Sequence, residues 1–319
     1  MAPPGCPAKR FAAVLVLVVS LAGCATFRAD RVIAERSAGL PSRVVLPDVP
    51  FHPQEAYHCG PASLAMVLNW AGVPVDPGQL APEVFTPGRQ GTLQAEIITA
   101  ARRHGRVAYS VSTLDDLLKE VAAGHPVIVF QNLGLPWYPR WHYAVVIGYD
   151  LPRREILLHS GLEAGKATWM RLFELTWEWG KNWGVVVLPP EKLPATAEEG
   201  PLVRALIGLE KAGQWGPAAR GYRAALAGWP GSYGALMGLG NSLYAAGDLP
   251  GAERAFRAAS IAHPIAGAPL NNLAQVLLEE GCPREALPYA MKAVEIGGPL
   301  KPLFLQTLEQ ITSGALHGH

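Results

Sequence analysis

Charge of either sign is scarce in this sequence, and it is almost balanced. Only 17% of the 319 residues are charged, and 27 Lys and Arg face 26 Asp and Glu, for a net charge of +1. Because no basic tract stands out, the composition gives no support to nucleic-acid binding. Half of the residues are hydrophobic, and the chain is long enough for two domains with their own cores.

Cysteine is scarce as well. The four cysteines are Cys6, Cys24, Cys59 and Cys282, and there is no Cys-x-x-Cys and no His-Glu-x-x-His motif. So few thiols exclude a small fold that depends on a disulfide framework. The missing motifs argue against a zinc site, and we expect neither a metal nor another cofactor.

The apolar run at residues 11–21 is too short to span a bilayer comfortably. It follows Lys9 and Arg10, and this order is typical of a secretory signal. It ends in Leu21-Ala-Gly-Cys24, which resembles a bacterial lipobox. The resemblance implies removal of residues 1–23, lipidation of Cys24 and, because Ala25 follows, an outer-membrane location facing the periplasm. A signal with a coincidental cysteine is the alternative.

Residues 24–48 are predicted to be a lipidated spacer, and residues 49–188 a first domain. Three stretches of this domain have apolar residues at helical spacing before a glycine: residues 60–71, 90–104 and 114–123. Short strands are predicted after them: residues 126–130, 142–149, 155–159 and 185–188. Helices followed by an antiparallel sheet predict an α+β fold.

A Pro-rich, charged linker is predicted at residues 189–200, and residues 201–319 show a different, helical pattern. Small residues recur there at intervals of 34: Gly213, Gly247 and Gly281, and Ala218, Ala252 and Ala286. Tyr222 and Phe256 share another position of the same period. This pattern resembles the tetratricopeptide repeat, a pair of helices. We therefore predict an all-α domain of about three repeats that binds a protein partner.

Cys59 is the candidate nucleophile of the first domain. It directly precedes a predicted helix, whose N-terminus favours a thiolate. His142 opens a predicted strand and can supply the imidazole, since cysteine and histidine that are distant in sequence meet in such sites. Gln54 can donate its side-chain N–H to the oxyanion of a tetrahedral intermediate. A buried structural thiol, a core histidine and an ordinary loop glutamine are the alternatives for these three residues.

Two motifs carry a family resemblance: Gln54-x₄-Cys59-Gly-Pro-Ala-Ser and His142-Tyr-Ala-Val-Val-x-Gly-Tyr-Asp. Over residues 49–188 the chain resembles the papain-like, bacteriocin-processing (double-glycine leader) peptidases. The resemblance implies a papain-like fold, with Cys59 as nucleophile, His142 as base and then acid, and Gln54 in the oxyanion hole. With the lipobox and the repeats, the whole chain is similar to a lipoprotein subgroup of such proteins.

One position departs from the family pattern. The family usually has an aspartate soon after the second hairpin strand, where it orients the histidine, and Ser160 stands at about that place here. A serine hydroxyl, a backbone carbonyl or Asn182 could orient the ring instead. Because the chain is predicted to be exported and shows no transporter segment, leader processing coupled to transport is not expected.

The sequence therefore predicts an envelope-anchored cysteine peptidase that hydrolyses a peptide or protein amide bond and uses its repeats to recruit a protein partner. The missing carboxylate leaves a second interpretation open, in which the domain is catalytically degenerate and the lipoprotein is a binding scaffold. A third interpretation is a cysteine hydrolase that acts on peptidoglycan cross-links.

Overall fold

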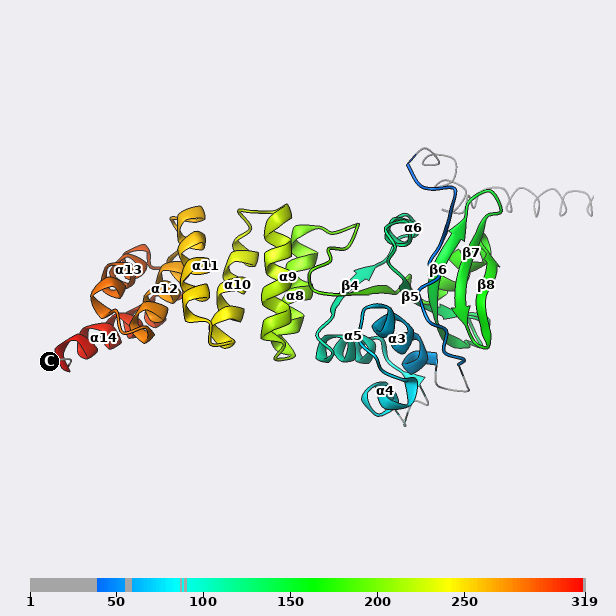
Figure 1. The fold of residues 1–319 in the computed structure, drawn as a ribbon, viewed down its shortest axis with the longest axis horizontal. Helices are drawn as coiled ribbons and strands as arrows, with labels where there is room; N and C mark the ends of the chain where they lie inside the picture. The colour runs from blue at the N-terminus through cyan, green and yellow to red at the C-terminus, as the bar shows by residue number, and fades with distance from the viewer. Residues whose placement is uncertain (1–38, 55–58, 87, 89–90, 318–319) are drawn as a thin grey trace, which may run out of the picture.

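The computed structural model describes residues 39–54, 59–86, 88 and 91–317. The predicted signal peptide, Cys24 and most of the predicted spacer lie outside these residues. The described chain is elongated: a domain of helices and strands stands at one end, and a row of helices extends from it to the C-terminus (Figure 1).

The first domain is built on a seven-stranded sheet in which every paired strand is antiparallel to its neighbour. The order is β4-β9-β5-β6-β7-β8, with β1 paired to β6. The strands are β1 (Arg43–Val45), β4 (Val107–Val111), β5 (Val127–Asn132), β6 (Trp141–Asp150), β7 (Glu155–Ser160), β8 (Glu163–Trp169) and β9 (Gly184–Leu188). β1 falls within the predicted spacer, so the end of that segment belongs to the sheet.

Helices cover both faces of the sheet. They are α3 (Cys59–Trp70), α4 (Pro77–Val84), α5 (Gln94–Arg103), α6 (Leu114–Ala122) and α7 (Met170–Trp179). A small hairpin of β2 (Phe85–Thr86) and β3 (Gly91–Thr92) follows α4. Alternate residues of β6 enter separate cores: Val145 packs in the cluster that holds the α3 residues, and Val146 packs with α6 and α7 residues. Side chains of a strand alternate in this way, so β6 is buried on both faces.

The C-terminal region is a row of antiparallel helix pairs. The helices are α8 (Glu199–Lys211), α9 (Trp215–Gly228), α10 (Tyr233–Ala245), α11 (Leu249–Ala262), α12 (Gly267–Glu279), α13 (Pro283–Ile296) and α14 (Lys301–His317). The turn glycines Gly213, Gly247 and Gly281 have φ of 71°, 81° and 78°. Only glycine adopts this left-handed conformation readily, which explains the 34-residue recurrence. The predicted α+β domain followed by an all-α repeat region is confirmed.

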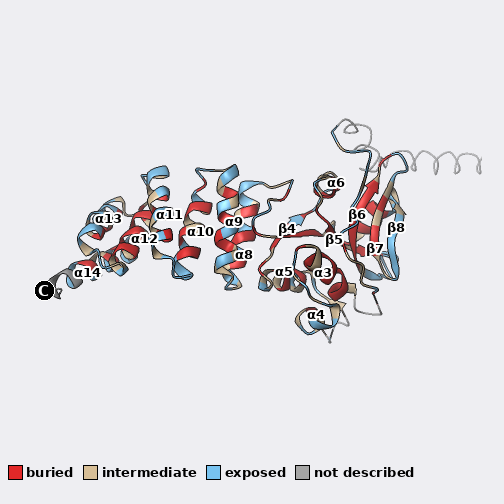
Figure 2. Cartoon of the chain, in the orientation of Figure 1, coloured by how far each residue is buried: buried red, intermediate tan, exposed pale blue. Residues whose placement is uncertain are grey.

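The two regions share one hydrophobic core. Val107 of β4 and Leu188 of β9 belong to the same buried cluster as Leu206 of α8 and Tyr222 of α9. Figure 2 shows buried residues running from the sheet into α8 and α9. The repeats are therefore packed against the first domain at this end of the sheet.

A buried carboxylate helps to fix the segment that joins the two regions. Glu120 of α6 is fully buried. It accepts hydrogen bonds from His125 Nδ1 at 2.7 Å, from the backbone N–H groups of Ala195 at 3.1 Å and Thr196 at 2.8 Å, and from Thr196 Oγ1 at 2.6 Å. Both carboxylate oxygens are occupied, so Glu120 holds Ala195 and Thr196 of this segment against the first domain.

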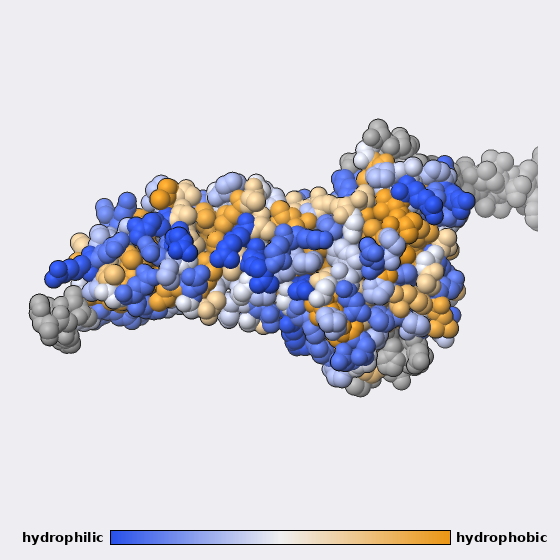
Figure 3. Space-filling view, in the orientation of Figure 1, coloured by the Kyte–Doolittle hydropathy of each residue, from blue (hydrophilic) through white to orange (hydrophobic). Residues whose placement is uncertain are grey.

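Among the described residues, no helix has the length and apolar character needed to cross a membrane. Figure 3 shows hydrophilic and hydrophobic residues mixed along the visible face of the repeat region.

Candidate active site

Cys59 is the first residue of α3, and its free thiol is partly exposed. Burial raises the pKa of the thiol above its usual value, and nearby backbone N–H groups of Tyr143, Gly60 and Cys59 itself offset this only in part. The Tyr143 N–H belongs to β6, directly after His142. The predicted nucleophile therefore lies against the backbone of β6 at the residue that directly follows the predicted base.

His142 is the second residue of β6. Its ring Nε2 lies 2.9 Å from Ser160 Oγ at the end of β7. Burial lowers the pKa of His142 to about 4, and the positive charge of Lys166 on β8 contributes in the same direction. The imidazole is therefore neutral near pH 7. The pKa of the Cys59 thiol is raised and the pKa of His142 is lowered. The two residues therefore rest as a thiol and a neutral imidazole, and not as an ion pair.

The group that faces His142 is the hydroxyl of Ser160, one of the candidates for the orienting role. Asn182, the other named candidate, lies in the turn after α7, where its backbone N–H donates to the carbonyl of Trp177 at 2.9 Å. When His142 Nε2–H donates to Ser160 Oγ, Nδ1 is unprotonated and can accept the thiol proton. A hydroxyl can also donate, so it selects the tautomer less strictly than a carboxylate does, and it brings no negative charge to an imidazolium.

Gln54 is buried and held by three hydrogen bonds. Its backbone N–H donates to the carbonyl of Gly161 at 2.9 Å, and the Gly161 N–H donates to Gln54 Oε1 at 2.9 Å. Gln54 Nε2 donates to Ser63 Oγ at 3.1 Å. Since an amide nitrogen carries two hydrogens, one N–H is left for an oxyanion.

The residues that position Gln54 were not singled out by the sequence. Ser63 is fully buried and lies four residues after Cys59, on the same face of α3. Gly161 directly follows Ser160, so one turn after β7 contacts both His142 and Gln54. The four-residue spacing of Cys59 and Ser63 was a signal that Ser63 lies on the same side of the helix as Cys59. No local pattern pointed to Gly161 as a partner of Gln54.

His159 has a structural environment. Its Nε2 donates to the carbonyl of Val49 at 3.1 Å, and its Nδ1 accepts from the Gly165 N–H at 3.1 Å. Both ring nitrogens are used, so this histidine is not available as a base. Within the described ranges, no group of three or more His, Cys, Asp and Glu side chains is placed to hold a metal.

An aromatic hairpin loop lies between β5 and β6, directly before His142. Trp137 is 80% exposed and Tyr138 is 72% exposed. Buried Asn132 orders the loop, because its Oδ1 accepts from the N–H groups of Gly134 at 2.9 Å and Arg140 at 2.8 Å. The loop therefore presents ordered apolar rings beside the strand that carries His142.

Alanine in place of Gly60 is expected to displace the start of α3. An added Cβ would lie 2.4 Å from Thr92 Oγ1 and 2.5 Å from Thr92 Cβ, which belongs to the short strand β3. Such overpacking costs about 1–3 kcal/mol, and it acts next to Cys59. Thermal denaturation should show a lower midpoint. Gly216→Ala in α9 is the matched control, since its Cβ would meet no atom closer than 3.8 Å; an equal loss in both variants would contradict the close contact.

Family comparisons agree with this architecture. A peptidase C39-like family matches residues 46–182, and tetratricopeptide repeats match residues 207–264 and 239–301. No curated protein matches the chain.

Several solved structures are similar to parts of the chain. A putative C39-like peptidase from Bacillus anthracis is 21% identical, with 46% of this chain and 98% of that chain covered and a TM-score of 0.40. The Yersinia enterocolitica type III secretion chaperone SycD, in complex with a peptide of the translocator YopD, is 19% identical, with 36% and 92% covered and a TM-score of 0.34. YrrB, a TPR protein with an unusual peptide-binding site, is 22% identical, with 37% and 60% covered and a TM-score of 0.34.

The family matches confirm the resemblance carried by the cysteine and histidine motifs and by the 34-residue period. This chain contains a peptidase C39-like domain at residues 46–182, followed by C-terminal tetratricopeptide repeats.

Proposed function

We propose that this protein is a cysteine peptidase that hydrolyses a peptide or protein amide bond, and that its repeats recruit a protein partner. The observation that carries the proposal is the meeting of three elements in a peptidase C39-like domain. The Cys59 thiol at the start of α3 faces β6, where His142 is held by Ser160, and Gln54 is fixed against the same helix through Ser63.

The reaction begins with the neutral pair. As Cys59 Sγ attacks the carbonyl carbon, His142 takes the thiol proton, and the oxygen becomes an oxyanion that accepts from Gln54 Nε2 and the Cys59 N–H. The intermediate collapses, the C–N bond breaks, and His142 gives its proton to the leaving amine. A water then attacks the thioester with His142 as base, which releases the carboxylic acid and restores the thiol.

The proton therefore moves together with the attack and is not transferred beforehand. In this site the raised pKa of Cys59 and the lowered pKa of His142 both disfavour a resting ion pair. Ser160 contributes orientation and no charge. This environment also supports the second candidate function, a catalytically degenerate domain that serves as a binding scaffold.

The proposed location is the outer membrane, with the chain anchored through lipid on Cys24 and the domains in the periplasm. The sequence signals at residues 1–25 support it. Arg43 of β1 pairs with Asp150, at the opposite end of β6 from His142. Eight residues of strand separate these ends by roughly 26 Å, so the tether would enter away from the site.

Alkylation by iodoacetamide tests the proposal. We expect modification of Cys59 and loss of peptide cleavage to proceed in parallel, at a rate that keeps rising with pH up to and beyond about 9, because burial raises the thiol pKa and only the thiolate reacts. Peptide mass spectrometry separates Cys59 from Cys282, whose exposed thiol is the internal comparison.

Two outcomes would count against this account. Full cleavage by completely alkylated protein would exclude the peptidase mechanism. An unreactive Cys59 in a protein that cleaves no peptide would favour the scaffold.

A further inference from the structure

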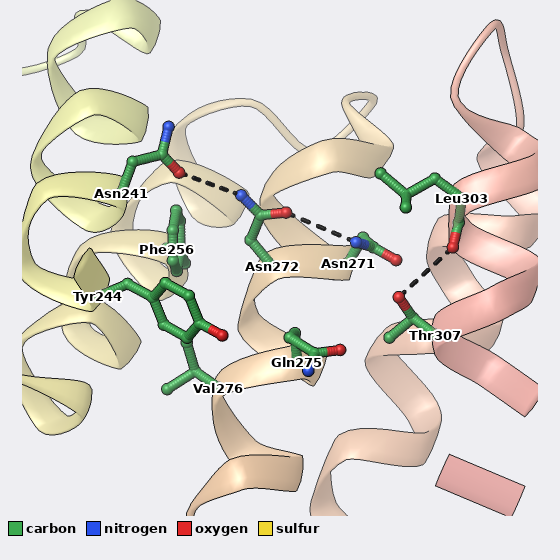
Figure 4. A pocket seen from close by; sticks show the side chains of 9 residues that line it. All are labelled: Asn241, Tyr244, Phe256, Asn271, Asn272, Gln275, Val276, Leu303 and Thr307. Carbon is green, nitrogen blue, oxygen red and sulfur yellow. Dashed lines mark hydrogen bonds between the residues drawn. The ribbon is translucent and has the colours of Figure 1, made fainter. Parts of the chain in front are cut away.

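Two surface features take no part in the reaction steps above. The first is a groove of about 280 Å³ among α10, α12 and α14 (Figure 4), and it belongs to the repeats, whose recruitment of a partner is already proposed. The second is the hairpin loop between β5 and β6. Five exposed large hydrophobic side chains gather on this loop and its base: Leu133, Leu135, Trp137, Tyr138 and Trp141. Such a concentration of apolar side chains on a surface marks an interaction site.

The backbone donors of this loop are almost all used within the loop itself. Two of its residues, Pro136 and Pro139, have no N–H. Five others donate to groups of the hairpin: Leu133, Gly134, Leu135, Tyr138 and Arg140. Trp137 at the tip therefore carries the one remaining N–H of residues 133–140.

A loop of this kind suits a lipid surface better than a peptide. An extended peptide is held through main-chain hydrogen bonds, and this loop has almost no N–H left to offer one. A lipid environment makes the opposite demand, since an unpaired backbone group is costly there. Tryptophan and tyrosine are enriched where proteins meet the polar boundary of a bilayer, because each joins an apolar ring to a polar group.

The charge of the loop agrees with this interpretation. Arg140 is exposed, and it is the only charged residue between Phe130 and Tyr149 in the sequence. At a bilayer that contains anionic lipid, the arginine is attracted and no carboxylate of the loop is repelled. The base of the loop is firm, because the Trp141 ring stacks on Phe130 with centroids 5.2 Å apart and an interplanar angle of 13°.

The proposed lipid anchor permits contact between the loop and the same bilayer. β1 begins at Arg43, which pairs with Asp150 at the end of β6 that lies away from the loop. Residues 24–42 reach at most about 65 Å when extended. The strand β6 covers roughly 33 Å. The chain between Cys24 and β1 is therefore long enough for the loop to touch the surface that holds the anchor.

We propose that the loop at residues 133–141 inserts its tip into a lipid interface, with Trp137 and Tyr138 among the headgroups and Arg140 beside anionic ones. The inference rests on the lipid anchor of the proposed function and is independent of catalysis. Because His142 directly follows the loop, the candidate site is held at the membrane surface. Its substrates are then polypeptide segments that lie close to that surface.

Quenching of tryptophan fluorescence by brominated lipid tests the insertion. The full chain is reconstituted in vesicles of phosphatidylcholine and phosphatidylglycerol, with and without bromine on the acyl chains. Bromine should quench the emission of the unaltered protein. Trp137→Phe should lose the larger part of this quenching, while the phenylalanine keeps the tip apolar. Flotation in a density gradient measures how much of each protein is bound to the vesicles.

Trp169→Phe is the matched control. Trp169 is 53% exposed and pairs with Glu155, at the end of the sheet where β1 enters, so its replacement should leave the quenching unchanged. Undiminished quenching in Trp137→Phe, or a loss in Trp169→Phe alone, would overturn the proposal and leave the anchor standing. A full chain that does not float with the vesicles would overturn both.

A double variant, Trp137→Ser with Tyr138→Ser, separates lipid contact from substrate contact. Both rings are exposed, so the melting midpoint should not change. Cleavage of a soluble peptide without vesicles should stay within about twofold, and cleavage of a peptide attached to vesicle lipid should fall about tenfold, because the site is no longer oriented at the surface. A tenfold loss with the soluble peptide would instead assign the rings to substrate binding. If the unaltered protein cleaves neither peptide, the peptidase proposal fails and the quenching still decides the insertion.

Discussion

Alanine in place of Cys59 is expected to reduce peptide cleavage by about 10⁶-fold, the loss that follows removal of the nucleophile in a triad hydrolase. Without Sγ no thioester can form, while Gln54 and His142 keep their contacts with Gly161 and Ser160. Liquid chromatography and mass spectrometry of peptide products would measure the loss. Because the side chain is small and partly exposed, the melting midpoint should change little.

Cys282→Ala is the matched control for this variant. The Cys282 thiol is exposed at the start of α13, in the repeat region. The Cys282→Ala variant should therefore cleave peptides at an unchanged rate. Cleavage by Cys59→Ala at the rate of the unaltered protein would show that the hydrolysis does not use this thiol.

Alanine in place of Glu120 is expected to lower the free energy of unfolding by several kcal/mol, because each buried donor left without an acceptor costs about 1–3 kcal/mol. The N–H groups of Ala195 and Thr196 would lose their acceptor, and His125 would lose its carboxylate partner. Since these bonds hold Ala195 and Thr196, hydrogen exchange should rise first around these two residues. Chemical denaturation and exchange mass spectrometry measure the two effects.

Glu191→Ala provides the comparison in the same segment. Its carboxylate pairs with Arg220 at the surface, with 54% of its side chain exposed, so its removal should cost no more than about 1 kcal/mol. Equal losses from the two variants would contradict the role of Glu120.

The network also predicts how stability depends on pH. Burial alone would raise the pKa of Glu120, but hydrogen bonds from His125, Thr196 and Ala195 outweigh it and lower the pKa from 4.5. A carboxyl with a lowered folded-state pKa stabilises the fold above its unfolded value, and this contribution is lost as pH falls through the folded value. Glu120→Ala should therefore lose less stability than the unaltered protein when pH is lowered from about 5.

Local sequence signals were enough to predict the candidate site by type. A cysteine before a helix and a histidine at the start of a strand are read from neighbouring residues, and Cys59 and His142 are found at those places. The repeats were predicted for the same reason, because each turn glycine must adopt a left-handed conformation and so recurs with the period. The helix predicted at residues 114–123 is found as α6, and Thr113 caps it by accepting from the Asp116 N–H at 3.1 Å.

The remaining features depend on contacts between distant segments. β8 is largely exposed and polar, so it lacks the apolar alternation that marks a strand. The bonds of Gln54 with Gly161 join residues about a hundred positions apart, and the bonds of Glu120 with Thr196 join residues 76 apart. A periodic pattern in the sequence does not predict contacts between residues that are so far apart in the chain.

The most direct test of acyl transfer to Cys59 is to let water and hydroxylamine compete for the acyl group of the thioester. Peptides that share the acyl half and differ in the leaving half should all give hydroxamate and carboxylic acid in one constant ratio at a given hydroxylamine concentration, because all pass through the same thioester. Cys59→Ala should give neither product. Carboxylic acid alone, or a ratio that changes with the leaving half, would contradict an acyl-enzyme on Cys59.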